Sequence, residues 1–313
     1  MLERRKGTLA MVVASVVWGF SGYYFKLLDQ ASFLEVLSHR IFWSFIIFSL
    51  VLIFRQKITR LFTLIVTDIK TAIITLLGCL MISINWVLFI FAVQNGMATE
   101  ASLGYFIFPL VAAFVGYAFL NERFTLVQWL SISITLIAVG ILTIDTGALP
   151  WIPLCIALSF CVYGIVKRNL KVDPIVSVTT DVMIVTPLAI SFLCYLHLGI
   201  SNEASTNPPG LFGIDPFYSV LFIVSGLITA GPLILLSYAT KRIPYTEVGL
   251  ISYINPSLQF LVATIVIKEA VSLGMIITFL LIWSALLLYS FEQIRLEKSS
   301  RKSVITSSTE LTE

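Results

Sequence analysis

The sequence predicts an all-α membrane protein with ten transmembrane helices arranged as two inverted five-helix repeats. Three observations lead to this prediction: the composition, the number of long apolar runs, and a motif that recurs at a constant offset. Of the 313 residues, 58% are hydrophobic and 12% are charged, whereas a soluble domain has about 25% charged residues. This composition excludes a disordered chain and a soluble enzyme with a polar surface.

The apolar runs are long enough for one bilayer crossing each, which takes roughly 20 residues. The first run follows Arg4, Arg5 and Lys6 and has no small-residue cleavage site, so we interpret it as a retained span rather than a secretory signal. The ten predicted spans are 8–27, 34–54, 71–93, 100–120, 126–144, 150–167, 175–197, 217–240, 247–267 and 272–291.

The lysine and arginine residues predict the orientation of these spans. With the N-terminus inside, all but three of the 20 Lys and Arg residues fall in cytoplasmic segments; the exceptions are Lys26, Arg40 and Lys268. Basic residues are retained on the cytoplasmic side of a membrane. We therefore expect both termini in the cytoplasm and the polar, Pro- and Gly-containing segment 198–216 outside.

An internal repeat divides the chain into two halves. Thr99, Glu100, Pro109 and Glu122 recur 147 positions later as Thr246, Glu247, Pro256 and Glu269. The predicted units are residues 1–147 with five helices, residues 148–293 with five helices, and a disordered cytoplasmic tail over 294–313. Because five is odd, the second half enters the membrane from the opposite side, an architecture that many secondary transporters share.

Ionisable residues inside the predicted spans are costly unless they are paired or hydrated. They fall into two levels, which the repeat relates as an outer and an inner gate. Membrane-surface snorkelling for the lysines and helix capping for the glutamates are the simpler alternatives. The gate candidates are Lys26, Glu35 and Glu100 at the outer level, and Lys167, Asp181 and Glu247 at the inner level.

Two prolines at equivalent positions, Pro109 and Pro256, are predicted to kink their helices. Each removes a backbone hydrogen bond, and the freed carbonyl is tolerated only against protein or a wet cavity. Aromatic and amide side chains near the kinks would suit an amphipathic solute, although single aromatic residues more often serve packing. The predicted solute path comprises Trp18, Tyr23, His39, Arg40, Asn85, Trp86, Tyr105, Tyr163, Tyr253, Asn255 and Gln259.

Catalytic and cofactor motifs are missing from the sequence. It has no H-E-x-x-H, G-x-S-x-G or P-loop pattern. The four cysteines lie in apolar stretches and are interpreted as small buried hydrophobes. We therefore expect no catalytic residues, no metal site, no cofactor and no nucleic-acid partner, and we interpret Glu122 and Glu269 as structural.

Several motifs resemble those of one transporter family. They are Glu35-x-x-x-His39-Arg40-x-x-Trp43-Ser44, Asn85-Trp86, the run from Glu100 to Ile107, and Tyr253-x-Asn255-Pro256. Together they resemble the RarD-type branch of the EamA family, in the drug/metabolite transporter superfamily, over about residues 8–291. The resemblance implies a ten-helix permease of the bacterial inner membrane with a central cavity. In one departure, Phe108 stands where the family usually has Asn before the proline.

The expected function is secondary transport of a small organic metabolite or drug by alternating access. Coupling to a proton or another ion, uniport and exchange all fit the sequence, and the oligomeric state is open. The alternatives are a membrane scaffold or sensor that transports nothing, and an intramembrane enzyme, for which the sequence offers no nucleophile–base or metal set.

Overall fold

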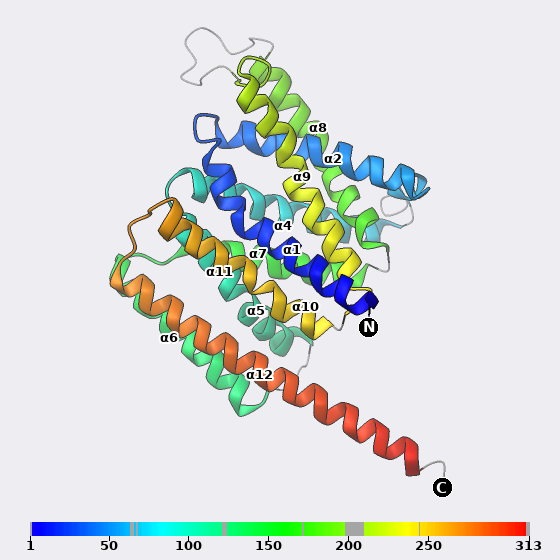
Figure 1. Ribbon diagram of the computed structural model, residues 1–313, viewed down its shortest axis with the longest axis vertical. Coiled ribbons are helices and arrows are strands. Elements are labelled where there is room, and N and C mark those ends of the chain that lie inside the picture. The colour runs from blue at the N-terminus through cyan, green and yellow to red at the C-terminus, as the bar shows by residue number, and fades with distance from the viewer. Residues whose placement is uncertain are drawn as a thin grey trace.

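A computed structural model describes residues 2–62, 66, 68–120, 124–170, 172–197, 210–243 and 245–310, and none of these residues lies in a β-strand. Figure 1 shows a bundle of long helices with one helix extending well beyond it. The helices are α1 (Leu2–Lys26), α2 (Phe33–Phe54), η1 (Ile58–Phe62), α4 (Ile69–Gln94), α5 (Ala98–Leu120), α6 (Leu126–Thr146), α7 (Trp151–Asn169), α8 (Pro174–His197), α9 (Pro216–Ala239), α10 (Tyr245–Ser252), α11 (Ile254–Leu261), η2 (Val262–Val266) and α12 (Leu273–Glu310).

Eight helical segments in the described residues are long and apolar enough to cross a membrane. Two more apolar helical segments, Ala98–Ala112 and Trp151–Lys167, are shorter than this criterion requires. Each of the ten predicted ranges falls on one of these helices, the ninth on α10, α11 and η2 together. The predicted all-helical class is confirmed, and eight of the ten spans meet the length criterion.

Side-chain and backbone caps explain where several helices begin. Ser32 accepts a hydrogen bond from the Glu35 N–H at 3.2 Å and starts α2, and Thr125 with Gln128 forms a capping box at the start of α6. Asp68 caps α4, and hydrogen bonds from the Thr71 hydroxyl and backbone N–H hold the pKa of its carboxyl below the ordinary value. These caps satisfy N–H groups that a first helical turn leaves unpaired.

Contacts between distant segments define two ends of the bundle. At one end, here called the N-terminal face, Arg242 at the end of α9 donates to Glu3, and Lys57 after α2 donates to Asp173 before α8. At the other end, here called the opposite face, Gln94 donates to the carbonyl of Leu28. Successive long helices run between these two faces in alternating directions.

Most helix pairs in the bundle join the first half of the chain to the second. α2 packs on α8 and α9, α6 packs on α12, and α5 packs on α7 and α11. α4 packs on α7, while α1 packs on α9 and α11. The α6–α12 pair lies at one side of the bundle in Figure 1, and α12 continues past it.

Glycines allow close contact between helices at two of these crossings. A Cβ atom on Gly19 of α1 would meet the Leu258 side chain of α11 at 2.5 Å, and one on Gly104 of α5 would meet Ile156 of α7 at 2.8 Å. Both distances are shorter than real Cβ contacts. Small residues at such points let membrane helices approach closely.

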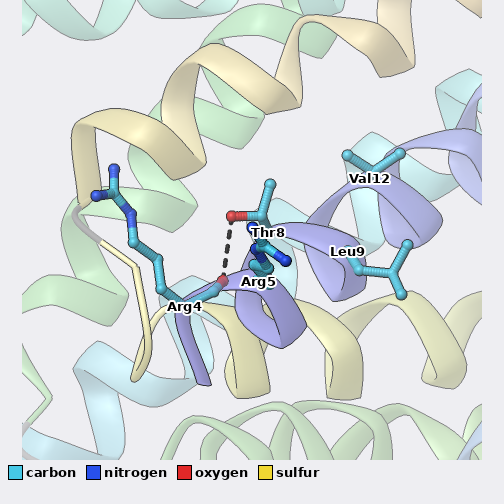
Figure 2. A pocket seen from close by; sticks show the side chains of 5 residues that line it. All are labelled: Arg4, Arg5, Thr8, Leu9 and Val12. Atoms are coloured by element: carbon cyan, nitrogen blue, oxygen red, sulfur yellow. Dashed lines mark hydrogen bonds between the residues drawn. The ribbon is translucent and has the colours of Figure 1, made fainter. Parts of the chain in front are cut away.

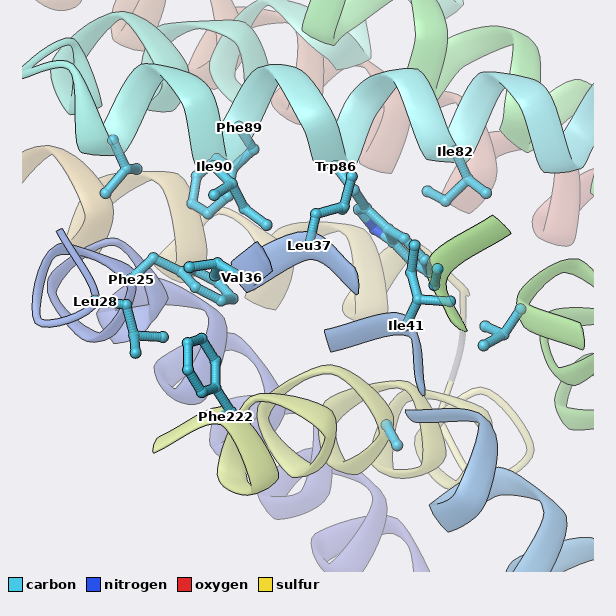
Figure 3. Packing of buried hydrophobic residues seen from close by; sticks show 14 of the residues in the cluster. Phe25, Leu28, Val36, Leu37, Ile41, Ile82, Trp86, Phe89, Ile90 and Phe222 are labelled. Carbon is cyan, nitrogen blue, oxygen red and sulfur yellow. The ribbon is translucent and has the colours of Figure 1, made fainter. Parts of the chain in front are cut away.

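The largest buried cluster lies where α1, α2, α4 and α9 meet. Figure 3 shows Phe25 of α1, Val36 and Ile41 of α2, Trp86 of α4 and Phe222 of α9 around it. All five side chains are buried. This packing fixes the middle of α2 against three helices and thereby positions the polar residues that α2 carries.

The two equivalent prolines act differently. Pro109 lies inside α5, which stays one helix, whereas the ninth predicted span is broken at Tyr253 between α10 and α11. The break places Pro256 in the first turn of α11, where a missing N–H removes no helical hydrogen bond. α11 then passes into the single π-helical turn η2, so the expected kink at Pro256 is a break with a π-turn after it.

Two expectations concern segments at the edge of the described chain. α12 is helical through Glu310, whereas the sequence predicts a disordered tail from 294. The helix continues over good helix formers, among them Leu296, Glu297, Lys298 and Arg301. Of the predicted polar loop 198–216, residues 198–209 lie outside the described residues, as does Glu122.

Candidate functional site

Arg40 is the buried cation at the centre of the bundle. It is 8% exposed, and its guanidinium carbon lies 4.8 Å from the ring centroid of Trp86 and 5.1 Å from that of Phe25. Its Nε donates to the Thr229 hydroxyl at 2.8 Å, and its Nη1 has no hydrogen-bond partner. Among the described residues, no carboxylate forms an ion pair with Arg40, so two aromatic rings and one hydroxyl surround a lone charge.

A second polar group joins α4, α5 and α7 within the same bundle. Asn85 is 1% exposed and donates from Nδ2 to the Ile156 carbonyl at 3.0 Å. Its Oδ1 accepts from the Tyr105 hydroxyl at 2.9 Å. Tyr105 also packs against the buried cluster that contains Trp86, and the Arg40 guanidinium lies over the Trp86 ring, so the predicted path residues Arg40, Asn85, Trp86 and Tyr105 belong to one buried region. We call these four residues the central cluster.

Lys167 and Asp181 form a buried ion pair between α7 and α8. The Lys167 Nζ lies 2.6 Å from Asp181 Oδ2 and donates to the Ser177 hydroxyl at 2.7 Å. The Tyr163 hydroxyl donates to Asp181 Oδ2 at 3.2 Å. The sequence placed Lys167 and Asp181 at one level and Tyr163 in the solute path, and the structure brings the three into direct contact.

The amides near Pro256 bind to one another and to α1. Gln259 Nε2 donates to Asn255 Oδ1 at 3.0 Å and to the Trp18 carbonyl at 3.3 Å. Gln259 Oε1 is buried without a hydrogen-bond partner. Tyr253 packs at the α5–α12 side of the bundle instead, so at the α1 contact α11 donates from Gln259 to the Trp18 carbonyl.

Glu35, His39 and His197 gather at the opposite face. Their potential ligand atoms all lie within 4.8 Å of one another. Glu35 Oε1 lies 3.9 Å from His197 Nε2 and accepts hydrogen bonds from the backbone N–H groups of Leu211 and Phe212. Glu35 and His39 are one helical turn apart on α2, while His197 is the last residue of α8.

Glutamates at the two faces hold the ends of the repeat-related helices α10 and α5. At the N-terminal face, Glu247 of α10 accepts from Arg4 at 2.8 Å and from the Thr8 hydroxyl at 2.7 Å. At the opposite face, Glu269 accepts from the Ala98 N–H at 2.7 Å and the Thr99 N–H at 2.8 Å. The structural role expected for Glu269 is thus a cap on α5.

A further ion pair ties α2 to α8 at the N-terminal face. Lys57 Nζ donates to Asp173 Oδ2 at 2.6 Å. Burial of the Asp173 carboxyl disfavours its charge, but hydrogen bonds from Lys57 and the Ile175 N–H outweigh this and hold its pKa below the ordinary value. Asp173 is therefore a carboxylate at neutral pH.

The gate candidates have the following partners in the structure. Lys167 of α7 pairs with Asp181 of α8, and Glu247 accepts from Arg4 and Thr8. Lys26 lies 3.6 Å from Asp29, and no described residue forms a hydrogen bond or ion pair with the side chain of Glu100. Tyr23 is 42% exposed and stands apart from the central cluster.

Among the described residues, one surface hollow lies away from the central cluster. Figure 2 shows it along the first turns of α1, with a volume of about 400 Å³ and a lining of Arg4, Arg5, Thr8, Leu9 and Val12. It is an open surface depression, whereas the central cluster is closed within the bundle.

Several contributing residues were not identified from the sequence. Thr229, Phe25 and Phe222 carry no motif and come to α2 from other helices. His197 is in none of the sequence motifs. The spacing of Glu35 and His39 on one helix face was visible, but their partner from α8 follows only from the α2–α8 packing.

Comparisons with known proteins identify the family of the chain. Residues 5–144 match the EamA-like transporter family. The chain is 34% identical to the "Uncharacterized transporter YojE" of Bacillus subtilis (strain 168), over 96% of this chain and 98% of the relative. It is 32% identical to "Protein RarD" of Escherichia coli (strain K12), over 96% and 99% of the two chains.

One solved crystal structure has the same fold, with a TM-score of 0.56 and 15% identity over 92% of this chain and 98% of its own. The family match, the full-length relatives and the apolar helices together identify a multi-pass membrane protein of a transporter family rather than an enzyme family. The chain belongs to the EamA-like transporter family, as a RarD-type member.

Proposed function

We propose that the chain is a secondary transporter that moves a small organic solute with an anionic group across the bacterial inner membrane by alternating access. The observation that carries this proposal is the lone charge of Arg40. It lies in the middle of the bundle, between Phe25 and Trp86, with one guanidinium nitrogen unpartnered.

A buried cation without a counter-ion is costly in a membrane protein, and such residues mark functional sites. The guanidinium is a planar donor that matches a carboxylate or phosphate bidentately. Hydrogen bonds to charged groups contribute about 1.5–3 kcal/mol, which corresponds to roughly ten- to a hundredfold in affinity. An anionic group on the solute would supply the partner that Arg40 lacks.

The surroundings of Arg40 suit the rest of such a solute. Trp86 and Phe25 are aromatic, and Tyr105 and Asn85 add a hydroxyl and an amide. Solute sites combine apolar walls with a few placed polar groups. We infer an amphipathic solute with one acidic group and an apolar or aromatic body.

Alternating access is supported by the pattern of helix contacts across the halves. Suppose that α1 corresponds to α7, α4 to α9 and α5 to α11. The α4–α7 pair then corresponds to α9–α1, and the α5–α7 pair corresponds to α11–α1. All four of these helix pairs are in contact. The α2–α8 and α6–α12 pairs map onto themselves. Such exchange symmetry is what two inverted five-helix repeats, 1–147 and 148–293, would produce.

The proposed orientation places the N-terminal face in the cytoplasm. This face carries Arg4, Arg5, Lys6, Arg55 and Lys57, and basic residues stay inside. Ten spans would then leave both termini in the cytoplasm. The helices α5 and α7, whose apolar segments Ala98–Ala112 and Trp151–Lys167 are shorter than the criterion, would be spans that are held between neighbours.

The test is uptake into liposomes that contain the purified protein. Pairs of small aromatic carboxylates and their neutral amides would be offered with and without a pH gradient. We expect saturable uptake of a carboxylate and at least about tenfold less of its amide. Arg40→Gln should lose that preference, while Arg55→Gln, which removes an exposed arginine of the same helix, should keep it.

Two results would contradict the proposal in distinguishable ways. Equal uptake of carboxylate and amide, unchanged in Arg40→Gln, would refute the anionic solute but keep transport. Uptake of no solute by folded protein would favour the scaffold or sensor. The melting temperature of each variant establishes that it is folded.

A further inference from the structure

We propose that Glu35, His39 and His197 form a binding site for a divalent transition-metal ion of the zinc class. The site lies at the opposite face, where α2 begins and α8 ends, and is separate from the central cluster. It contains both histidines of the chain, which are contributed by helices from different halves.

The three side chains supply a ligand set that zinc uses. Two imidazoles and one carboxylate with an open fourth position for water make a tetrahedral site. With metal–ligand distances of about 2.0–2.2 Å, ligand atoms in such a site lie roughly 3.4 Å apart. Here the atoms lie within 4.8 Å of one another, and Glu35 Oε1 is 3.9 Å from His197 Nε2. Small side-chain rotations would bring them to bonding distance.

His39 provides the independent observation that points to a ligand. It is 3% exposed, and neither imidazole nitrogen has a hydrogen-bond partner. Its ring stacks on that of Phe222 with centroids 4.3 Å apart, and the tilted ring of Phe212 lies 4.6 Å away. An unpartnered buried polar group loses free energy relative to water. A metal ion bound to one nitrogen would remove this deficit.

The other two residues are placed as a metal site requires. Backbone N–H groups of Leu211 and Phe212 donate to Glu35 Oε1 at 2.8 Å and 3.4 Å and orient the carboxylate. Such outer hydrogen bonds position metal ligands and tune their affinity. His197 is solvent-accessible, so an ion can reach the site from the face of the bundle.

The alternative is a Glu35–His197 ion pair without metal. It would leave both nitrogens of His39 unpartnered, so the metal accounts for more of the geometry. A bound ion would also join α2, α8 and the segment around Phe212, and would hold the two halves together at this face.

The experiment uses the full chain purified without a polyhistidine tag and stripped with a chelator. Zn²⁺ would be titrated by calorimetry and Co²⁺ by visible absorption. We expect one ion per chain, a tetrahedral Co²⁺ spectrum with nitrogen and oxygen ligands, and a higher melting temperature, because an ion that binds only the folded state stabilises it.

The variants are chosen to separate ligation from folding. Glu35→Gln and His197→Gln should each weaken Zn²⁺ binding at least about tenfold, as loss of metal-site partners does. Asp29→Asn removes an exposed carboxylate at the same face and should leave the affinity unchanged. Absence of saturable binding to folded protein, or equal affinity in Glu35→Gln, His197→Gln and the parent, would overturn the proposal. Neither result bears on whether the protein transports a solute.

Discussion

At the scale of single residues, the bundle accommodates the half-buried Lys167 and the buried Arg40 in different ways. Lys167 has a carboxylate, a hydroxyl and a carbonyl as partners, which compensates much of the cost of its burial. Arg40 has two rings and one hydroxyl and keeps an unpartnered nitrogen. The protein itself supplies all the partners of Lys167 that are named here, whereas the unpartnered nitrogen of Arg40 can bind a ligand.

This difference predicts the response to removing each partner of the buried pair. Lys167→Met should destabilise the protein by about 3–5 kcal/mol, because it leaves Asp181 as an uncompensated buried charge. Replacing both, with Lys167→Met and Asp181→Leu, should recover most of that loss. Chemical unfolding in detergent measures both variants. A double variant no more stable than the single one would show that the pair is not what balances these charges.

The sequence predicted which residues are polar inside the bundle, but only some of their partners. Lys167 and Asp181 were placed at one level and do meet, and Tyr163, predicted for the solute path, joins them. The pairing of Glu247 with Arg4 was not predicted, because it depends on how the start of α1 crosses α10. Likewise His39 and His197 become neighbours only through the packing of α2 on α8.

At the scale of elements, α5 and the α10–α11–η2 segment are repeat-related but differ in continuity. α5 accommodates Pro109 as one helix, and its partner breaks at Tyr253 before Pro256. The sequence predicted a proline-dependent kink in both. It could not predict a break in only one, because the two prolines and their spacing are the same and the difference lies in the surrounding contacts.

The two prolines therefore offer a matched pair of variants. Pro109→Ala should stabilise the fold, because proline inside a helix costs about 3 kcal/mol or more. Pro256→Ala should stabilise it less, since this proline already lies in a first turn, yet it should impair uptake more by favouring a continuous α10–α11 helix. Melting temperatures and uptake in liposomes measure both effects. Equal effects of the two substitutions would contradict a distinct role for the break.

At the scale of the whole molecule, the two halves contact each other more extensively than either half contacts itself. The constant offset of 147 residues defined the halves, and the composition and apolar runs defined the helices. Which helices pair across the halves follows from side-chain packing between distant segments and could not be derived from one sequence. The contacts of Glu247 with Arg4 and of Glu269 with the start of α5 place one carboxylate at each face.

The central claim is that these two faces open in alternation. The most direct measurement is cysteine accessibility from each side of the membrane, in a background without the four native cysteines. Ser15→Cys on α1 and Ser102→Cys on α5 replace buried residues and serve as reporters.

Glu247→Gln releases α10 from Arg4 and should increase labelling of the Ser15→Cys protein from the N-terminal face, without increasing labelling of the Ser102→Cys protein. Glu269→Gln releases the cap on α5 and should do the reverse from the opposite face. Labelling of both reporters together, or of neither, in both variants would contradict alternating access.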